Sequence, residues 1–212
     1  MKINQKNKIM PDPILTTEKI ILEAAKKVFL EKGFEGSRMQ LIADEADINK
    51  ALLHYYFRSK DNLFEAIFEE AFMQFLPNIS QVLNSELPLV DKVNAFVEQY
   101  INMLQNNPHL PIFIMRELQR EPQRIIELIK KLGLKPELIE AFFKKEKEKN
   151  QIVTIPTTHL LVNIISLCVF PFMARPIIEG IVFNNDKEAF NNFLQERKKL
   201  VADFIINAIT VK

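Results

Sequence analysis

Glycine and cysteine are scarce in this sequence. Its 212 residues, of which 48% are hydrophobic and 26% charged, include only four Gly and one Cys. Dinucleotide folds, phosphate-binding loops and β-rich sandwiches need glycine at tight turns, so the low count argues against all of them. A lone Cys168 allows no internal disulfide and no Cys/His metal pair, which suits a reducing, cytoplasmic setting. We expect an all-α protein with no metal or cofactor.

A targeting or membrane segment is also lacking. Lys2, Lys6 and Lys8 precede no apolar run, so neither a secretory signal nor a transit peptide is predicted. Residues 151–174 carry no formal charge, but their apolar part, 160–174, is shorter than the ~20 residues that a spanning helix needs. We interpret this segment as a buried core helix and expect no membrane partner.

Charge is distributed unevenly along the chain. Residues 1–60 hold 11 Lys/Arg against 8 Asp/Glu, whereas residues 61–212 hold 17 against 19. A basic first third joined to a slightly acidic remainder is compatible with a small nucleic-acid module, because phosphate attraction needs only a local positive face.

Apolar residues at three- and four-residue spacing predict helices throughout. The first spans 16–33, with Thr16 or Thr17 as its cap and Gly33 at its end. Ser37 and Gln40 have the spacing of a capping box before a short helix over 38–46. Asn49 caps a helix over 50–57, and Ser59 caps a fourth that stops at Pro77. Later helices are expected at 88–105, 111–119, 122–132, 136–149, 156–170, 175–183 and 187–211, with a loop at 151–155.

The second and third helices have the plan of a helix-turn-helix. Ala43 is small enough to let the two helices cross closely, and Ile48 can fill the angle between them. The third helix offers Lys50, His54 and Tyr55 on its outer face. Such a helix can enter the major groove of DNA and read base edges.

These residues resemble the TetR-type transcriptional regulators. The resemblance rests on Leu41-Ile42-Ala43-Asp44-Glu45-Ala46, on the run from Ile48 to Phe57, on Ser59-Lys60-Asp61-Asn62-Leu63, and on the preceding helix that ends at Gly33-Phe34. Three residues depart from the family pattern: Asp47 replaces a usual turn glycine, Ala51 a common glycine, and His54 a usual tyrosine. The resemblance implies a three-helix DNA-binding domain at 14–74 and a larger helical ligand-binding and dimerisation domain at 75–212.

The resemblance also implies the DNA contacts. Bases are faced by Lys50, Ala51, Leu52 and Tyr55, and phosphates are contacted by His54, Tyr56 and Lys60. Asn49 caps the recognition helix, and the second helix opens with Arg38, Met39 and Gln40, near amides that can receive a phosphate. Tyr56 and Leu52 are equally open to a packing role, and the two lysines to simple solvation.

In the second domain, the resemblance implies a pocket for a small apolar or amphipathic effector. Its candidate residues are Phe113, Arg116, Phe142, Asn163, Phe170 and Met173. Ordinary core packing is the alternative for each, and Arg116 could instead pair with Glu117.

A homodimer on a palindromic operator is expected, because two short recognition helices then share two half-sites. The apolar faces of 156–170 and 187–211 are the candidate interface, and charged residues at Phe204 and Ile205 should yield monomers. A repressor is favoured over an activator by family habit. An enzyme is disfavoured because no nucleophile, base and orienting group can be assembled. A ligand-binding or protein-interaction module of the same fold, without DNA binding, is the remaining alternative.

Overall fold

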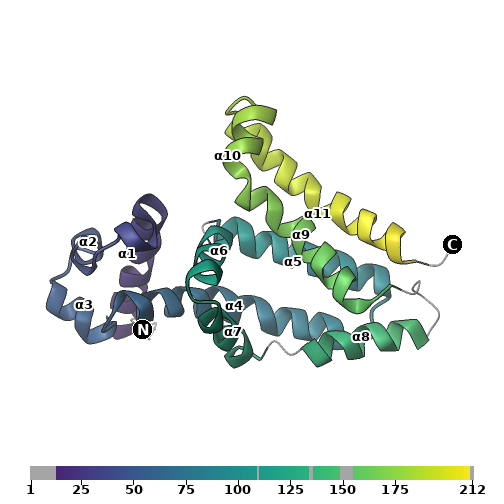
Figure 1. Cartoon of the computed structure of the whole chain (residues 1–212), viewed down its shortest axis with the longest axis horizontal. Coiled ribbons are helices and arrows are strands. Elements are labelled where there is room, and N and C mark those ends of the chain that lie inside the picture. Colours follow the sequence, from purple (N-terminus) through teal and green to yellow (C-terminus); the bar gives the residue numbers. More distant parts are fainter. Residues whose placement is uncertain (1–12, 109, 134–135, 149–154, 211–212) are drawn as a thin grey trace, which may run out of the picture. The chain divides into compact units, whose positions relative to one another are not determined.

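The computed structural model describes residues 13–108, 110–133, 136–148 and 155–210, and every regular element within these ranges is a helix (Figure 1). The all-α prediction is therefore confirmed. The helices are α1 (Pro13–Gly36), α2 (Met39–Glu45), α3 (Lys50–Tyr56), α4 (Lys60–Asn84), α5 (Leu89–Asn106), α6 (Leu110–Arg120), α7 (Pro122–Lys131), α8 (Pro136–Glu148), α9 (Thr157–Met173), α10 (Arg175–Ile177), the π-helix η1 (Ile178–Val182) and α11 (Lys187–Ile209). The loop expected at 151–155 lies almost entirely outside the described residues.

The chain divides into two compact units between Phe68 and Glu69. The N-terminal unit contains α1, α2, α3 and the first part of α4, and the C-terminal unit contains the rest. Helix α4 thus contributes residues to both units.

The N-terminal unit is built around the apolar stripe predicted for its first helix. Ile21, Ala25 and Phe29 of α1 are buried, and α1 packs against α2, which packs against α3. Phe34 follows on the same helix, and its ring meets Phe64 of α4 edge-on at a centroid separation of 5.8 Å. Aromatic pairs of this geometry stabilise a core beyond the area they bury.

The ends of α1 differ in part from the prediction. The helix begins at Pro13, so Thr16 and Thr17 lie inside it and the expected cap is wrong. Proline suits a first helical turn because its missing N–H has no intrahelical partner there. Gly33 does interrupt the helix, with φ 69° and ψ 172°, a conformation that glycine adopts without steric cost.

The capping box predicted at Ser37 does not form. The buried Ser37 hydroxyl donates instead to the Gly33 carbonyl at 2.6 Å, and the Val28 carbonyl lies 3.3 Å from the same oxygen. It therefore satisfies the Gly33 carbonyl, at the point where α1 is interrupted. Arg38 occupies the N-cap position of α2 without a side-chain cap, and the Gln40 amide donates to Asp44 at 2.7 Å.

Helix α4 does not stop at Pro77, as the sequence suggested, but continues to Asn84. Pro77 has no N–H for the carbonyl of Met73, which costs one helical hydrogen bond. Phe75 and Ile79 on either side are buried, with 8% and 6% of their surface exposed. Burial of this apolar face keeps the helix continuous across the proline.

The C-terminal unit centres on α5, which packs most extensively against α11 and also against α9. Val97 and Ile101 of α5 are almost fully buried, as are Phe190 and Leu194 of α11. The helix expected at 175–183 is present as α10 followed by η1. Within the described ranges no single helix is both long and apolar enough to cross a bilayer, and only α9 joined to α10 and η1, across a 58° bend, meets that test.

Buried polar links join the helices of this unit. The carboxylate of buried Glu117 pairs with Arg120 at 3.1 Å and with Arg124 of α7 at 3.6 Å, so it holds α6 to α7. Glu117 thus pairs with these two arginines and not with Arg116, the partner that the sequence had suggested. Arg197 of α11 donates to the carbonyl of Leu167 in α9 at 2.7 Å.

Candidate DNA-binding surface and effector groove

The turn between α2 and α3 fixes the direction of α3. Asp47 takes φ 52°, in the left-handed region that favours glycine, and the Ile48 N–H donates to the Ala43 carbonyl at 3.0 Å. Asn49 then caps α3, because its side-chain oxygen accepts from the Leu52 N–H at 2.8 Å. Ala43 is fully buried and Ile48 is half-buried, as their predicted packing roles require.

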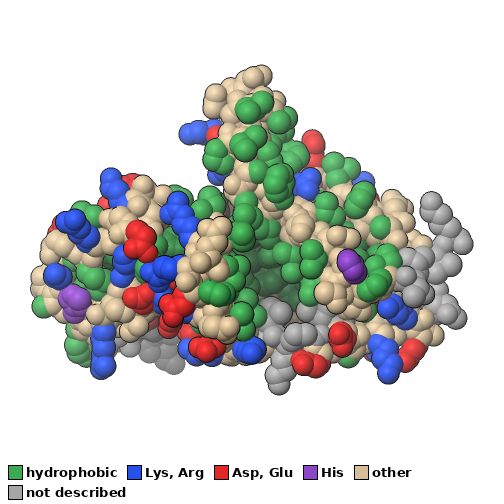
Figure 2. Space-filling model, viewed as in Figure 1, with side chains coloured by type: hydrophobic (Ala, Val, Ile, Leu, Met, Phe, Trp, Pro, Cys, Tyr) green, Lys and Arg blue, Asp and Glu red, His purple; other side chains and the backbone are tan. Residues whose placement is uncertain are grey.

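One face of α3 is open to solvent. Leu53 is fully buried and Phe57 nearly so, whereas Lys50, Ala51, His54 and Tyr55 are exposed, with 81% of Tyr55 accessible. Leu52 and Tyr56 are half-buried, and the rings of Tyr55 and Tyr56 meet edge-on at 5.5 Å. Figure 2 shows Lys and Arg side chains and a histidine around the end of the N-terminal unit that holds α3.

Two of the predicted phosphate contacts are hydrogen-bonded within the protein. The Nδ1 of His54 lies 3.1 Å from the carbonyl oxygen of Arg58, which follows the end of α3, and this contact orients the imidazole ring. The Lys60 ammonium donates to the Phe34 carbonyl at 2.6 Å and lies 4.3 Å from the Phe34 ring centroid. Lys60 therefore also ties the start of α4 to the end of α1.

The remaining predicted DNA contacts lie at the start of α2 and differ in exposure. Arg38 and Gln40 are exposed, and Met39 is half-buried. Arg38 precedes the free amides of the first turn of α2, where its charge adds to the partial positive charge of a helix N-terminus.

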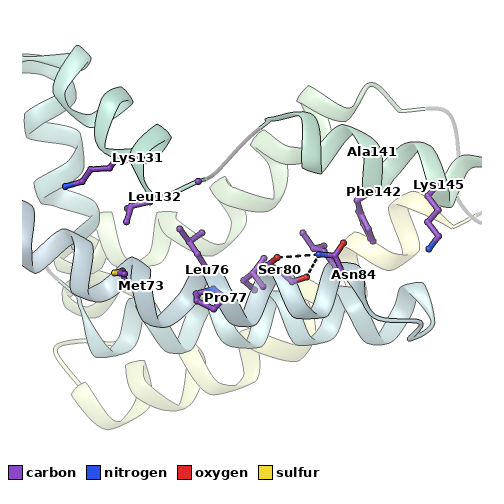
Figure 3. A pocket seen from close by; sticks show the side chains of 13 residues that line it. Met73, Leu76, Pro77, Ser80, Asn84, Lys131, Leu132, Ala141, Phe142 and Lys145 are labelled. Carbon is purple, nitrogen blue, oxygen red and sulfur yellow. Dashed lines mark hydrogen bonds between the residues drawn. The ribbon is translucent and has the colours of Figure 1, made fainter.

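The C-terminal unit contains a groove of about 570 Å³ between α4, the end of α7, and α8 (Figure 3). This volume lies within the range of ~300–1,000 Å³ that is usual for small-molecule pockets. Its described lining residues are Met73, Leu76, Pro77, Ile79, Ser80, Leu83, Asn84, Lys131, Leu132, Gly133, Ala141, Phe142 and Lys145.

Of the six predicted effector contacts, Phe142 lines this groove and the other five do not. Phe113 is buried, Arg116 and Asn163 are exposed, and Met173 is half-buried. Phe170 is 61% exposed on α9. Sequence reasoning missed the α4 part of the wall because it ended the helix at Pro77, although Met73 and Ser80 follow the helical period on either side of that proline.

A second apolar surface lies on α9, η1 and α11. Large hydrophobic side chains on these helices are strongly exposed, among them Phe170, Ile181 at 73%, Leu200 at 62% and Phe204 at 64%. Figure 2 shows hydrophobic side chains gathered over α9 and α10. Exposed apolar patches of this kind mark interaction sites. We call Phe170, Ile181, Leu200 and Phe204 the apolar face.

Ile205, which the sequence placed in the interface with Phe204, is only 3% exposed. It belongs to the core between α11 and its neighbours. A charge at Ile205 would unfold the unit, so a test of the interface must use the exposed residues alone.

Comparison with known proteins relates the N-terminal unit to a protein family. Residues 21–67 match the family model of the bacterial regulatory proteins of the tetR family. A probable HTH-type transcriptional regulator, YttP, of Bacillus subtilis is 25% identical over 180 residues, covering 83% of this chain and 86% of that protein. These matches support a transcriptional regulator of the TetR family.

Other relatives extend the comparison over shorter lengths. The HTH-type transcriptional repressor NicS of Pseudomonas putida is 42% identical over 55 residues, which cover 26% of each chain. A fatty acid metabolism regulator protein of Bacillus subtilis is 24% identical and covers 52% of this chain and 59% of its own. Members of the TetR family are regulators that bind DNA and are not enzymes, in agreement with the class that the sequence favoured.

The fold match spans nearly the whole chain. The crystal structure of HlyIIR, a hemolysin II transcriptional regulator, superposes with a TM-score of 0.67 at 23% identity and covers 93% of this chain and 99% of its own. This TetR fold accommodates the departures in the turn of the helix-turn-helix, because Asp47 adopts the positive φ for which glycine is usual.

Proposed function

We propose that this TetR regulator is a homodimeric repressor that reads a palindromic operator with α3 and is released by a small apolar or amphipathic effector. The observation that carries the DNA-reading part is the outer face of α3. Four polar, aromatic or small side chains face solvent on a helix that is capped at Asn49 and anchored by Leu53. We assign base contacts to Lys50, Ala51, Leu52 and Tyr55. Lys50, Ala51 and Tyr55 are exposed, and half-buried Leu52 follows Ala51 in the same helix.

Phosphate contacts are assigned to the groups that flank this face, namely His54, Tyr56 and Lys60, with Arg38, Met39 and Gln40 at the start of α2. Such contacts fix the position of a protein on DNA without reading its sequence. Lys60 can bind a phosphate only if its ammonium donates to the phosphate and to the Phe34 carbonyl at the same time. This is feasible because an ammonium has three N–H donors.

Dimerisation is supported by the apolar face. Four large hydrophobic side chains on α9, η1 and α11 each leave more than half of their surface in contact with solvent. A second copy of the same face would cover them, and a two-fold interface is the commonest way in which soluble chains associate.

Release by an effector is supported by the position of the groove. Its wall includes Met73, Pro77 and Asn84 of α4, and the same helix begins with Lys60 in the N-terminal unit. An effector that favours one placement of α4 would shift the population of dimers whose recognition helices fit the operator.

In vitro selection of duplex DNA from a random pool tests the DNA-reading part. We expect enrichment of a palindromic site with half-sites about one helical turn apart, bound with a steep salt dependence. Mass spectrometry shows whether the protein carries a bound molecule. If protein free of bound molecules enriches no sequence, the alternative is favoured, namely a ligand-binding or protein-interaction module of the same fold that does not bind DNA.

Substitutions then assign the roles of individual residues. Tyr55→Ala should weaken binding to the selected site by about tenfold, as the loss of a base contact typically costs ~1–3 kcal/mol. Lys19→Ala, which removes an exposed lysine on α1, is the matched control and should change affinity much less. Lys60→Ala should lower both affinity and the salt slope if Lys60 binds phosphate, and only the melting temperature if its bond to Phe34 is its whole role.

A further inference from the structure

The groove of the C-terminal unit has apolar side chains along its whole length and most of its polar ones toward one end. Its α4 wall presents Met73, Pro77, Ser80 and Asn84, which follow one another at four- and three-residue steps along one face of the helix. In Figure 3, Met73, Leu76 and Leu132 lie toward one end together with Lys131, whereas Ser80, Asn84 and Lys145 lie toward the other together with Ala141 and Phe142. A ligand that fits both ends has an apolar part and a polar part.

The charge of the wall has one sign. Its described lining residues include two lysines and no carboxylate. Lys131 donates to Glu69 at 2.5 Å, and in Figure 3 its side chain extends away from the other lining residues. Lys145 is the lysine at the polar end, so this end attracts an anionic head group.

The present partner of Lys145 is weakly held. Its ammonium lies 3.6 Å from a carboxylate oxygen of Glu86, a side chain that is 87% exposed. Exposed pairs of this kind contribute little to stability, since both groups are well hydrated when apart. An incoming anion can therefore take the place of Glu86 at little cost.

The opposite wall is firmly fixed. Glu146 of α8 pairs with Lys92 of α5 at 3.6 Å, and 1% and 2% of these side chains are exposed. The Lys92 ammonium also lies 5.3 Å from the ring centroid of Phe142, which lines the groove. Because a buried pair is costly to separate, α8 holds Phe142 and Lys145 in a set position across from α4.

We propose that this groove binds a free carboxylate with a single alkyl chain, its acid group at Lys145 and its chain along Leu76 and Leu132 toward Met73. The wall excludes a cationic amphiphile on charge and gives a neutral one no charged partner. This inference rests on the proposed function only for its consequence, the release of DNA, and stands or falls on binding by itself.

Isothermal titration of the full chain with three probes of equal chain length tests the head group. The probes are dodecanoate, dodecan-1-ol and dodecyltrimethylammonium, each below its micelle-forming concentration. We expect one dodecanoate per chain, bound at least about fivefold more tightly than the alcohol, with the cation weakest. Equal or tighter binding of the alcohol or the cation would overturn the assignment of an anionic head group.

Two variants test the location. Lys145→Gln should weaken dodecanoate about fivefold and leave dodecan-1-ol unchanged, because only the charged head group loses a partner. Lys144→Gln, at an exposed position of α8 outside the groove lining, is the matched control and should leave both affinities within about twofold. Ala141→Trp, at an exposed position of α8 that lines the groove, should abolish binding of both probes by filling the space.

The outcomes separate this inference from the proposed function. Dodecanoate affinity unaffected by Lys145→Gln would overturn the inference, even if Ala141→Trp failed to fold. Binding that follows the expected pattern but leaves the selected operator occupied would retain the inference and contradict release by the effector. If the protein selects a DNA site but does not bind dodecanoate, the inference is overturned and the proposed DNA reading is retained.

Discussion

Arg197 and Pro171 offer a quantitative test of how the C-terminal unit is held together. Pro171 lies inside α9 and has no N–H, so the carbonyl of Leu167, four residues earlier, has no intrahelical donor. The Arg197 guanidinium of α11 donates to that carbonyl at 2.7 Å and lies 5.5 Å from the Phe193 ring centroid. Arg197 thereby replaces the hydrogen bond that the proline removes.

Arg197→Met should leave the Leu167 carbonyl without a partner, which costs about 1–3 kcal/mol of unfolding free energy. The net loss should fall at the low end, about 1–2 kcal/mol, because the Arg197 Nε is itself buried without a hydrogen-bond partner and its removal regains solvation. For a chain of this size that loss lowers the melting temperature by roughly 2–8 °C.

The same substitution in a Pro171→Ala background makes the prediction specific. The alanine in that background supplies the N–H that the Leu167 carbonyl lacks, so Arg197→Met should then cost less than about 0.5 kcal/mol. Urea unfolding of the four proteins at one protein concentration measures the cycle. An equal cost in both backgrounds would show that Arg197 acts through something other than this carbonyl.

Three further predictions concern the interface, the turn and the buried thiol. Phe204→Asp should convert dimers to monomers in sedimentation velocity with little change in circular dichroism, and an unchanged mass would exclude the apolar face as the interface. Asp47→Val should lower the unfolding free energy by about 1–2 kcal/mol while Asp47→Gly should not lower it, because φ is 52° there and glycine adopts that conformation without steric cost; equal losses would refute a backbone cause. Burial raises the pKa of Cys168 from 9.0 to about 12, more than nearby Arg197 lowers it. The neutral thiol is thus favoured in the folded state, and stability should fall as pH rises from about 9 toward 12, less steeply in Cys168→Ala; equal slopes for the two proteins in alkaline urea melts would contradict this.

The helix-turn-helix could be predicted because its signals are local. Asn49 caps α3 and Ser59 accepts from the Asn62 N–H at 3.1 Å, as their sequence positions indicated. Gly33 interrupts α1 for the same reason, since a residue without Cβ adopts positive φ readily.

Other features depended on contacts between residues far apart in the sequence. The hydroxyl of Ser37 had the spacing of a capping box, but the interruption at Gly33 presents it with a carbonyl to satisfy. Pro77 was expected to end α4, yet burial of Phe75 and Ile79 outweighs one lost hydrogen bond. Ile205 and Phe204 are adjacent in an amphipathic helix, and only packing against neighbouring helices distinguishes the buried one from the exposed one.

The groove of the C-terminal unit was the least predictable feature for the same reason. Its wall combines α4, α7 and α8, and no periodicity within one helix indicates which of its faces meets another across a gap. Aromatic residues were therefore chosen by type, and Phe142 alone among them lines the groove.

The central claim is that α3 reads base edges in DNA, and in vitro selection performed in parallel with wild-type protein and a Lys50→Ala variant tests it most directly. A residue that contacts a base changes the preferred base at its own position, whereas a phosphate contact weakens binding to all sequences alike. We predict a palindromic motif for the wild type and, for the variant, relaxed preference at one symmetry-related pair of positions. An identical motif from both proteins would contradict base reading by Lys50, and the absence of any motif from effector-free wild-type protein would contradict the claim itself.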